Sequence, residues 1–146
     1  MIGFDFDGTL SNDAFFLLAK DYVKHSKACI ITSRNEIGED IFQRAAALGI
    51  PDDLIFAIGK IHKLYPNKAD FIKHKQMMSD NAFHISMFFD NDPYEVEALQ
   101  KAGILGMWIM PDVNDHDGYQ PGGLMAEIVD TFVQQRNKPQ RLASTE

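Results

Sequence analysis

The sequence predicts a three-layer α/β domain in which helices cover both faces of a five-stranded, mostly parallel sheet. Short apolar runs alternate five times with segments that carry apolar residues at helical spacing, and this order is typical of a parallel sheet with crossover helices. The apolar runs are continuous rather than alternating, as in strands that are buried on both faces. The expected fold is therefore Rossmann-like.

The length of the chain favours one domain. At 146 residues the chain can form a proper core, whereas two domains would both be small. We expect a single domain over residues 1–135, followed by a tail, 136–146, that has little to bury and frays. Composition, with 45% hydrophobic and 24% charged residues, is typical of a soluble globular protein.

Charge and hydropathy disfavour several classes of protein. The formal net charge of −7 disfavours indiscriminate binding to nucleic acid or to an anionic membrane. No apolar run approaches the roughly 18 to 20 residues that span a bilayer, and the N-terminus lacks the order of a secretory signal. We therefore expect a cytoplasmic protein that does not contact a membrane. The single cysteine, Cys29, lies in an apolar run and is expected to be a buried, inert thiol.

The five expected strands are apolar runs too short for helices. Runs of this length bounded by turn residues fit strands better than helices. They are residues 1–4, 28–31, 54–58, 84–89 and 105–110.

The expected helices are marked by capping residues. They begin at Ser11, Asn35, Asn67 and Asp92, with a last helix after Gly123. The clearest start has Asp92 as an acidic cap, Pro93 at the first helical position and Glu95 at the third. Asn67 and Asp70 form a similar pair, with Asp in the place usually held by Glu.

Polar clusters follow three of the expected strands at the point where each strand ends. In parallel sheets ligands gather outside the carboxyl ends of the strands, so we expect the three clusters to share one edge. The clusters are Asp5 and Asp7, then Thr32, Ser33 and Arg34, and then Asp90 and Asp92.

Asp5 and Asp7 suggest metal chemistry. Two carboxylates so close in sequence repel each other, so at neutral pH one is protonated or a cation lies between them. A hard divalent ion fits, because Mg²⁺ takes one or two carboxylates and leaves positions open for a phosphate. Gly8 lets the backbone turn sharply and approach a ligand closely. The alternative is a strand that ends in an acidic turn.

These clusters resemble the four motifs of the haloacid dehalogenase (HAD) superfamily of phosphohydrolases. The first motif is Asp5-Phe6-Asp7-Gly8-Thr9, the second is Thr32, the third is a lysine that opens a helix, and the fourth is Asp90. The resemblance covers residue 1 to about residue 110. Its first motif is specific, whereas the second and third persuade only through their order.

The resemblance implies a phosphatase of the capless type that hydrolyses a phosphate monoester through an aspartyl-phosphate. Asp5 would be the nucleophile, Asp7 the general acid and base, and Thr32 a ligand of the phosphoryl oxygens. Lys68 would neutralise Asp5 and a phosphoryl oxygen. Because the dehalogenase members lack the second aspartate of the first motif and do not use Mg²⁺, Asp7 favours phosphate chemistry.

The resemblance also implies a Mg²⁺ site and a phosphate site. The ion would be held by the carboxylates of Asp5 and Asp90 and by the backbone carbonyl of Asp7, where it offsets the repulsion between nucleophile and phosphate. Asp92 is either a further metal ligand or only a helix cap, since Asn91 occupies the position next to Asp90. The residues expected to bind substrate are Gly8, Thr9, Ser33 and Arg34, of which Arg34 is alternatively a solvated surface charge.

Three lysines are candidates for the third motif. Lys68 precedes Asp90 by 22 positions, about one helix and one strand. It also lies in the first turn of a helix, where a positive charge is unfavourable because it opposes the helix macrodipole. An unfavourable residue without a visible local compensation suggests a functional site. Lys60 and Lys63 are the alternatives.

The spacing of the motifs leaves no room for an inserted cap domain. An uncapped site would suit the phosphorylated end of a macromolecule, or a phosphorylated small molecule enclosed by a partner subunit of a homo-oligomer. The window 60–75 holds five lysines and one aspartate, which favours a nucleotide or a phosphorylated nucleic-acid end, unless it is a solvated helix face. Two other functions stay open: a catalytically silent binding or assembly protein, and a phosphotransferase with an acceptor other than water.

Overall fold

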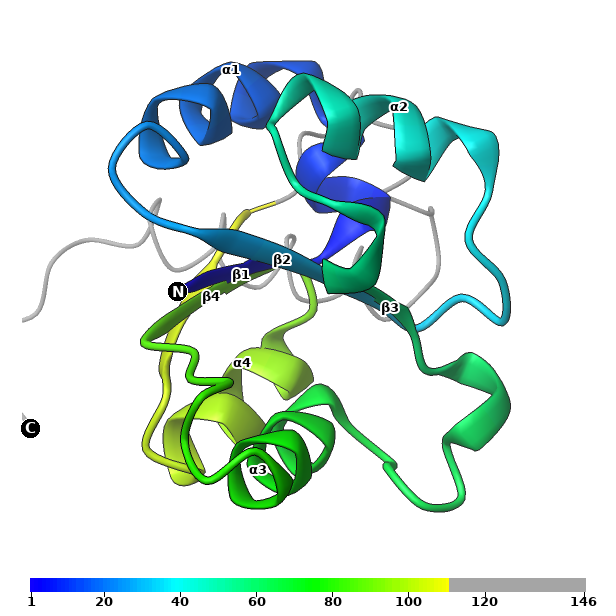
Figure 1. The fold of residues 1–146 in the computed structure, drawn as a ribbon, viewed down its shortest axis with the longest axis vertical. Helices are drawn as coiled ribbons and strands as arrows, with labels where there is room; N and C mark the ends of the chain where they lie inside the picture. The colour runs from blue at the N-terminus through cyan, green and yellow to red at the C-terminus, as the bar shows by residue number, and fades with distance from the viewer. Residues whose placement is uncertain (111–146) are drawn as a thin grey trace, which may run out of the picture.

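Five parallel strands form the central layer of the protein in a computed structural model that describes residues 1–110 (Figure 1). The sheet order is β3-β2-β1-β4-β5, and each neighbouring pair is parallel. The strands are β1 Ile2–Phe4, β2 Ala28–Thr32, β3 Ile55–Ala57, β4 Met87–Asp90 and β5 Leu105–Trp108. The predicted α/β fold is therefore confirmed, with all five strands parallel. The expected last helix and the tail lie outside the described residues.

Two pairs of helices complete the three layers. Figure 1 shows α1 and α2 on one face of the sheet and α3 and α4 on the other. Their bounds are α1 Asp13–Tyr22, α2 Glu39–Ala47, α3 Lys68–Met78 and α4 Pro93–Lys101. Short helical turns lie at Asp52–Leu54 and Gly59–Ile61, whereas the turn Phe6–Leu10 is kinked, with non-helical backbone at Asp7 and Gly8. Within residues 1–110 no cap domain is inserted between these elements. No helix of this part of the chain is long and apolar enough to cross a bilayer.

The sheet separates two apolar clusters. The cluster under α1 and α2 includes Phe4 and Ile30, and the cluster under α3 and α4 includes Ile31 and Phe88. Neighbouring positions of one strand, such as Ile30 and Ile31, thus contribute to opposite clusters, as the alternation of side chains along a strand requires. This explains why the strand sequences read as continuous apolar runs.

Two of the expected caps are confirmed. The Asn67 side chain accepts a hydrogen bond from the Asp70 N–H (2.8 Å) at the start of α3. Asp92 accepts from the Tyr94 N–H (2.9 Å) at the start of α4, where Pro93 is the first helical residue. Helices α3 and α4 therefore begin where the local sequence predicts.

The caps expected for the first two helices were wrong. Asn12, not Ser11, caps α1, because the Ser11 hydroxyl accepts the Gly8 N–H (2.8 Å) and closes the turn after β1. Helix α2 begins only at Glu39, after Gly38, instead of after Asn35. The preceding segment is held elsewhere, since the Arg34 carbonyl accepts the Gly59 N–H (2.9 Å).

Candidate active site

The turn after β1 presents the first pair of aspartates. The Asp5 N–H donates to the Phe89 carbonyl of neighbouring β4 (2.9 Å), so Asp5 lies at the carboxyl edge of the sheet. Gly8 has φ +78°, a conformation that favours glycine. A Cβ atom at Gly8 would lie 2.2 Å from the Asn91 amide. Gly8 is therefore required both by its backbone conformation and by close approach of a neighbouring loop.

Asp5, Lys68 and Asp90 form a buried charged cluster. The Lys68 ammonium contacts Asp5 Oδ1 at 2.9 Å and Asp90 Oδ2 at 2.6 Å, and the three residues are 5%, 2% and 0% exposed, respectively. The two carboxylates therefore lie within about 6 Å of each other, well inside the roughly 8 Å beyond which one ion could not join them. The topology explains the meeting, because β1 and β4 are neighbours and Lys68 opens the helix that precedes β4.

The other two lysine candidates lie away from this cluster. Lys60 is exposed and pairs with Glu36 at 3.0 Å, and Lys63 is exposed. Lys75 lies at the far end of α3, two helical turns from Lys68, where its ammonium lies over aromatic rings. The basic window 60–75 therefore does not form one patch at the site.

Burial and charge set the protonation of the cluster. Burial raises the pKa of Asp5, against the opposing effect of Lys68. Burial, followed by repulsion from Asp5, raises the pKa of Asp90 to about 7. Burial alone would lower the pKa of Lys68, but the charges of Asp5 and Asp90 outweigh it, so that its pKa lies above the usual value. Because two carboxyl groups share one ammonium, neutrality requires a further cation or a proton.

Neighbouring groups hold this cluster in place. The Thr9 hydroxyl donates to Asp5 Oδ2 (3.2 Å), and Thr9 is fully buried. Thr9, which was expected to bind substrate, therefore holds Asp5 in place and does not face solvent. Glu95 Oε2, from α4, accepts the backbone N–H of Lys68 (2.9 Å), and burial raises the pKa of Glu95. The sequence predicted Glu95 only as part of the start of its own helix. Its contact with Lys68 depends on the packing of α3 against α4, which the sequence pattern does not indicate.

Asn91 is a site residue that sequence analysis passed over. One end of its amide faces the Asp7 carbonyl oxygen at 3.0 Å and Asp5 Oδ2 at 2.9 Å, and both contacts are hydrogen bonds when the nitrogen occupies that end. The Trp108 indole N–H donates to the backbone carbonyl of Asn91 (3.1 Å) and so holds the loop between β4 and α4. Its place next to Asp90 is visible in the sequence, but the further metal ligand considered there was Asp92.

Asp92 serves as the cap of α4, and its own N–H donates to Asp90 Oδ1 (2.9 Å). Within residues 1–110, no three His, Cys, Asp or Glu side chains form a group that could hold a metal. Asp92 therefore does not complete a three-carboxylate site with Asp5 and Asp90. Any ion at this edge would need neutral oxygens beside the two carboxylates.

The oxygen atoms at this edge would suit a hard divalent ion only after the Asn91 amide turns its oxygen toward Asp5, opposite to the orientation that forms its two hydrogen bonds. With its oxygen toward Asp5, the Asn91 amide would lie 2.9 Å from Asp5 Oδ2 and 3.0 Å from the Asp7 carbonyl. Neighbouring oxygens around Mg²⁺ are about 3 Å apart when each lies 2.0–2.1 Å from the ion. The residues that could hold Mg²⁺ are thus Asp5, Asp90, Asn91 and, through its carbonyl, Asp7.

Arg34 links the second cluster to Asp7. Its guanidinium donates to both Asp7 oxygens (2.8 and 2.6 Å) and to both Asp40 oxygens (2.9 and 3.0 Å), and it lies 5.1 Å from the Phe6 ring centroid. Arg34 is therefore a partly exposed charge that is paired with two carboxylates. Sequence analysis missed this pairing, although β2 lies directly beside β1.

The remaining predicted residues of the second cluster lie at the same edge. Thr32 is buried, and its hydroxyl accepts the Arg34 N–H (3.2 Å). Ser33 is exposed. The sheet thus brings together the carboxyl ends of β1, β2 and β4, as the sequence predicts, with Lys68 added from α3.

No protein-family model, curated protein or solved structure matches the chain. A function for this protein must therefore be inferred from its residues and their geometry.

Proposed function

We propose that the protein is a Mg²⁺-dependent phosphatase of the HAD type that hydrolyses a phosphate monoester through an aspartyl-phosphate on Asp5. The observation that carries the proposal is the buried contact of Asp5 with Lys68, which also holds Asp90. Removing three charged groups from water is unfavourable unless they are well paired, and such a cluster is weak support for stability. Buried groups with shifted pKa values in this setting favour a functional site.

Asp5 and Asp7 divide the chemistry between them. An Asp5 oxygen attacks phosphorus, the ester P–O bond breaks, and the leaving oxygen takes a proton from the Asp7 carboxyl group. Water then attacks phosphorus and gives its proton to Asp7, and the Asp5 carboxylate leaves as inorganic phosphate forms. Lys68 offsets the negative charge that gathers around Asp5 during both steps.

The oxygens of Asp5, Asp90, Asn91 and the Asp7 carbonyl would hold Mg²⁺, which when bound offsets the repulsion between the nucleophile and the anionic phosphate. Lys68, which Asp90 holds in place, orients one oxygen of Asp5, and the Thr9 hydroxyl donates to the other.

Arg34 must release Asp7 before the acid step. Both Asp7 oxygens accept hydrogen bonds from Arg34, so protonation of this carboxyl group would cost at least one of these bonds. A guanidinium also matches the geometry of a phosphoryl group. We infer that Arg34 exchanges Asp7 for a phosphoryl oxygen when substrate binds.

The substrate is proposed only as a class, a phosphate monoester. An uncapped site accepts a phosphorylated small molecule or the phosphorylated end of a macromolecule. Because the lysines of window 60–75 do not gather at the site, they add no support for a nucleic-acid end. A screen of phosphate esters that includes 3′- and 5′-phosphorylated nucleotides and oligonucleotides separates these cases.

Hydrolysis of an aryl phosphate with Mg²⁺ tests the proposal. Asp5→Asn should lower kcat roughly a thousandfold or more, and a chelator should do the same to the wild type. Asp21→Asn, which changes an exposed aspartate on α1, is the matched control and should keep full activity. Equal activity in wild type and Asp5→Asn, with both folded by circular dichroism, would remove the catalytic claim.

Trapping the intermediate gives a second readout. Acid-quenched wild type should carry a phosphoryl group that hydroxylamine releases, and Asp5→Asn should not. Phosphate found on an acceptor other than water would indicate a phosphotransferase. A folded wild type that hydrolyses none of the screened esters would favour a silent binding protein.

A further inference from the structure

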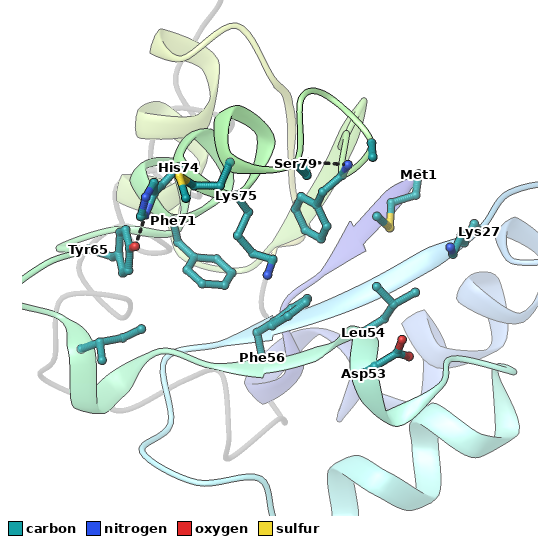
Figure 2. Close-up of a pocket in the computed structure, with 14 residues that line it drawn as sticks. Met1, Lys27, Asp53, Leu54, Phe56, Tyr65, Phe71, His74, Lys75 and Ser79 are labelled. Carbon is teal, nitrogen blue, oxygen red and sulfur yellow. Dashed lines mark hydrogen bonds between the residues drawn. The ribbon is translucent and has the colours of Figure 1, made fainter.

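A hollow lies at the end of the sheet opposite to the candidate active site. It is a cavity of about 680 Å³ between α3 and edge strand β3 (Figure 2). Met1 and Lys27, which precede β1 and β2, border it, whereas Asp5 and Thr32 lie at the other ends of these strands. Small-molecule sites commonly measure about 300–1,000 Å³, so the cavity has the size of a ligand site and is separate from the proposed active site.

One of the residues that line the cavity, Lys75, lies among aromatic rings. Figure 2 shows the Lys75 side chain extending from α3 toward Phe56 and Phe71. Its ammonium lies 4.6 Å from the ring centroid of Phe56, 5.4 Å from that of Phe83 and 5.8 Å from that of Phe71. None of the ion pairs within residues 1–110 involves Lys75. The cavity therefore contains a partly buried positive charge without a carboxylate partner.

This arrangement would favour an anionic ligand over a cationic one. The negative ring faces are already occupied by the Lys75 ammonium, so a second cation would meet a like charge. An anion would instead pair with an ammonium that is partly removed from water, where the attraction is stronger than at the surface. The lining contains two lysines, Lys27 and Lys75, against one acidic residue, Asp53, in a chain whose net charge is −7.

Several of the side chains that line the cavity are aromatic, which would favour a flat ligand. Tyr65 packs edge-on against Phe71, with ring centroids 5.4 Å apart, and its hydroxyl is hydrogen-bonded to His74 Nδ1. Phe56 and Phe83 also line the cavity. Aromatic side chains pack favourably against flat rings in offset or edge-to-face geometry.

We propose that this cavity binds a small anionic molecule with a flat aromatic body, its acidic group at Lys75 and its body against the half-buried rings of Phe56 and Tyr65. The proposal is independent of the proposed phosphatase activity, because Lys75 lies two helical turns, about 10 Å, from Lys68 along α3.

Binding of 8-anilinonaphthalene-1-sulfonate to the full chain tests this proposal. Fluorescence titration of the native protein should give saturable binding of one probe per chain. Lys75→Gln should weaken the affinity at least about tenfold, whereas Lys75→Arg, which keeps the charge, should not. The matched control is Lys73→Gln, since Lys73 is exposed on the same helix. No saturable binding, or equal affinity in Lys75→Gln, would overturn the proposal.

A neutral probe keeps the proposal testable if Lys75→Gln does not fold. N-Phenyl-1-naphthylamine has the same aromatic body without the sulfonate, and it should bind the wild type at least about tenfold more weakly. Equal affinity for the neutral and the anionic probe would show that Lys75 does not select an anion.

A second copy of the chain is the competing occupant. Leu64, Met77 and Met78 are more than 70% exposed, and Met78 lines the cavity. Sedimentation should show a monomer that binds the probe. A dimer that forms at micromolar concentration and excludes the probe would overturn the proposal and identify the cavity as an interface.

Discussion

Replacing Lys68 with methionine tests whether this side chain balances the charge at the centre of the site. Methionine keeps an unbranched side chain but has no charge and no N–H groups. In the wild type the ammonium contacts Asp5 at 2.9 Å and Asp90 at 2.6 Å, and the three side chains are at most 7% exposed. The variant leaves two buried carboxyl groups within about 6 Å of each other without their cation.

The expected loss of stability is large. Breaking a buried ion pair by removing one partner costs about 3–5 kcal/mol. Because Lys68 serves two carboxylates, we expect a loss near the upper end, about 4–5 kcal/mol at pH 8 with chelator present. Domains of this kind have about 5–15 kcal/mol of stability in total, so the variant should be close to unfolding.

The loss should depend on pH, with a defined sign. The folded pKa of Asp90 is about 7, above its ordinary value of 3.8, and removing the favourable charge of Lys68 raises it further. Between these values the folded variant binds more protons than the unfolded chain, so its stability falls as pH rises. The deficit relative to the wild type should therefore be smaller at pH 6 than at pH 8.

Urea denaturation of a double-mutant cycle measures the effect. The four proteins are the wild type, Lys68→Met, Asp90→Asn and the combination of both changes. Removing one carboxylate should rescue part of the loss, so the double variant should be more stable than Lys68→Met alone, with a coupling energy of about 2 kcal/mol or more. Lys73→Met, on the exposed face of the same helix, is the control and should change stability by less than about 0.5 kcal/mol.

Two results would refute this reasoning. One is a loss of less than about 1 kcal/mol in Lys68→Met, since a buried pair with this geometry should exceed the value of a surface pair. The other is a double variant that is no more stable than Lys68→Met. The comparison stands even if the single variant is unfolded, because the double variant should then be the more folded of the two.

Three further predictions concern other positions. Gly8→Ala should lower the free energy of unfolding in urea by more than Gly49→Ala. Both have φ above +70°, but an added Cβ meets an atom 2.2 Å away at Gly8 and nothing within 4 Å at Gly49, so equal losses would contradict the packing argument. Burial raises the pKa of Cys29 to about 12. Native protein should therefore resist iodoacetamide at pH 8. The free energy of unfolding should also fall by roughly 1.4 kcal/mol per pH unit between pH 9 and about pH 12, because only the thiol of the unfolded chain ionises in this range. Cys29→Ala should lack this fall. Glu95→Ala should lose about 1 kcal/mol because the Lys68 N–H loses its acceptor, whereas Glu95→Gln keeps an acceptor oxygen and should lose less than half of that in the same urea assay.

Local pattern and one rule of topology predicted most of the candidate site. Continuous apolar runs identified the strands, and capping pairs at Asn67 and Asp92 identified the starts of α3 and α4. Parallel strands place their carboxyl ends at one edge, so Asp5 and Asp90 could be brought together from their positions after strands. Lys68 was predicted from its distance to Asp90 and from its unfavourable place at a helix start.

Other parts of the site depend on which elements become neighbours. The contacts of Arg34 with Asp7, of Glu95 with Lys68, and of Asn91 with Asp5 join side chains from different loops or helices. Each contact requires a particular side-chain direction as well as neighbouring backbones, and neither is encoded by spacing along the chain.

By itself, then, the sequence determined the parallel α/β architecture and the polar edge at which its aspartates meet, because strand burial and helix capping act over a few residues. Only the tertiary structure decided which lysine lies between the carboxylates, which partners hold it there, and that Lys75 lies among aromatic rings in a separate cavity. The physical reason is that these features arise from the packing of α3 against the sheet and α4, and packing joins residues that no local pattern relates.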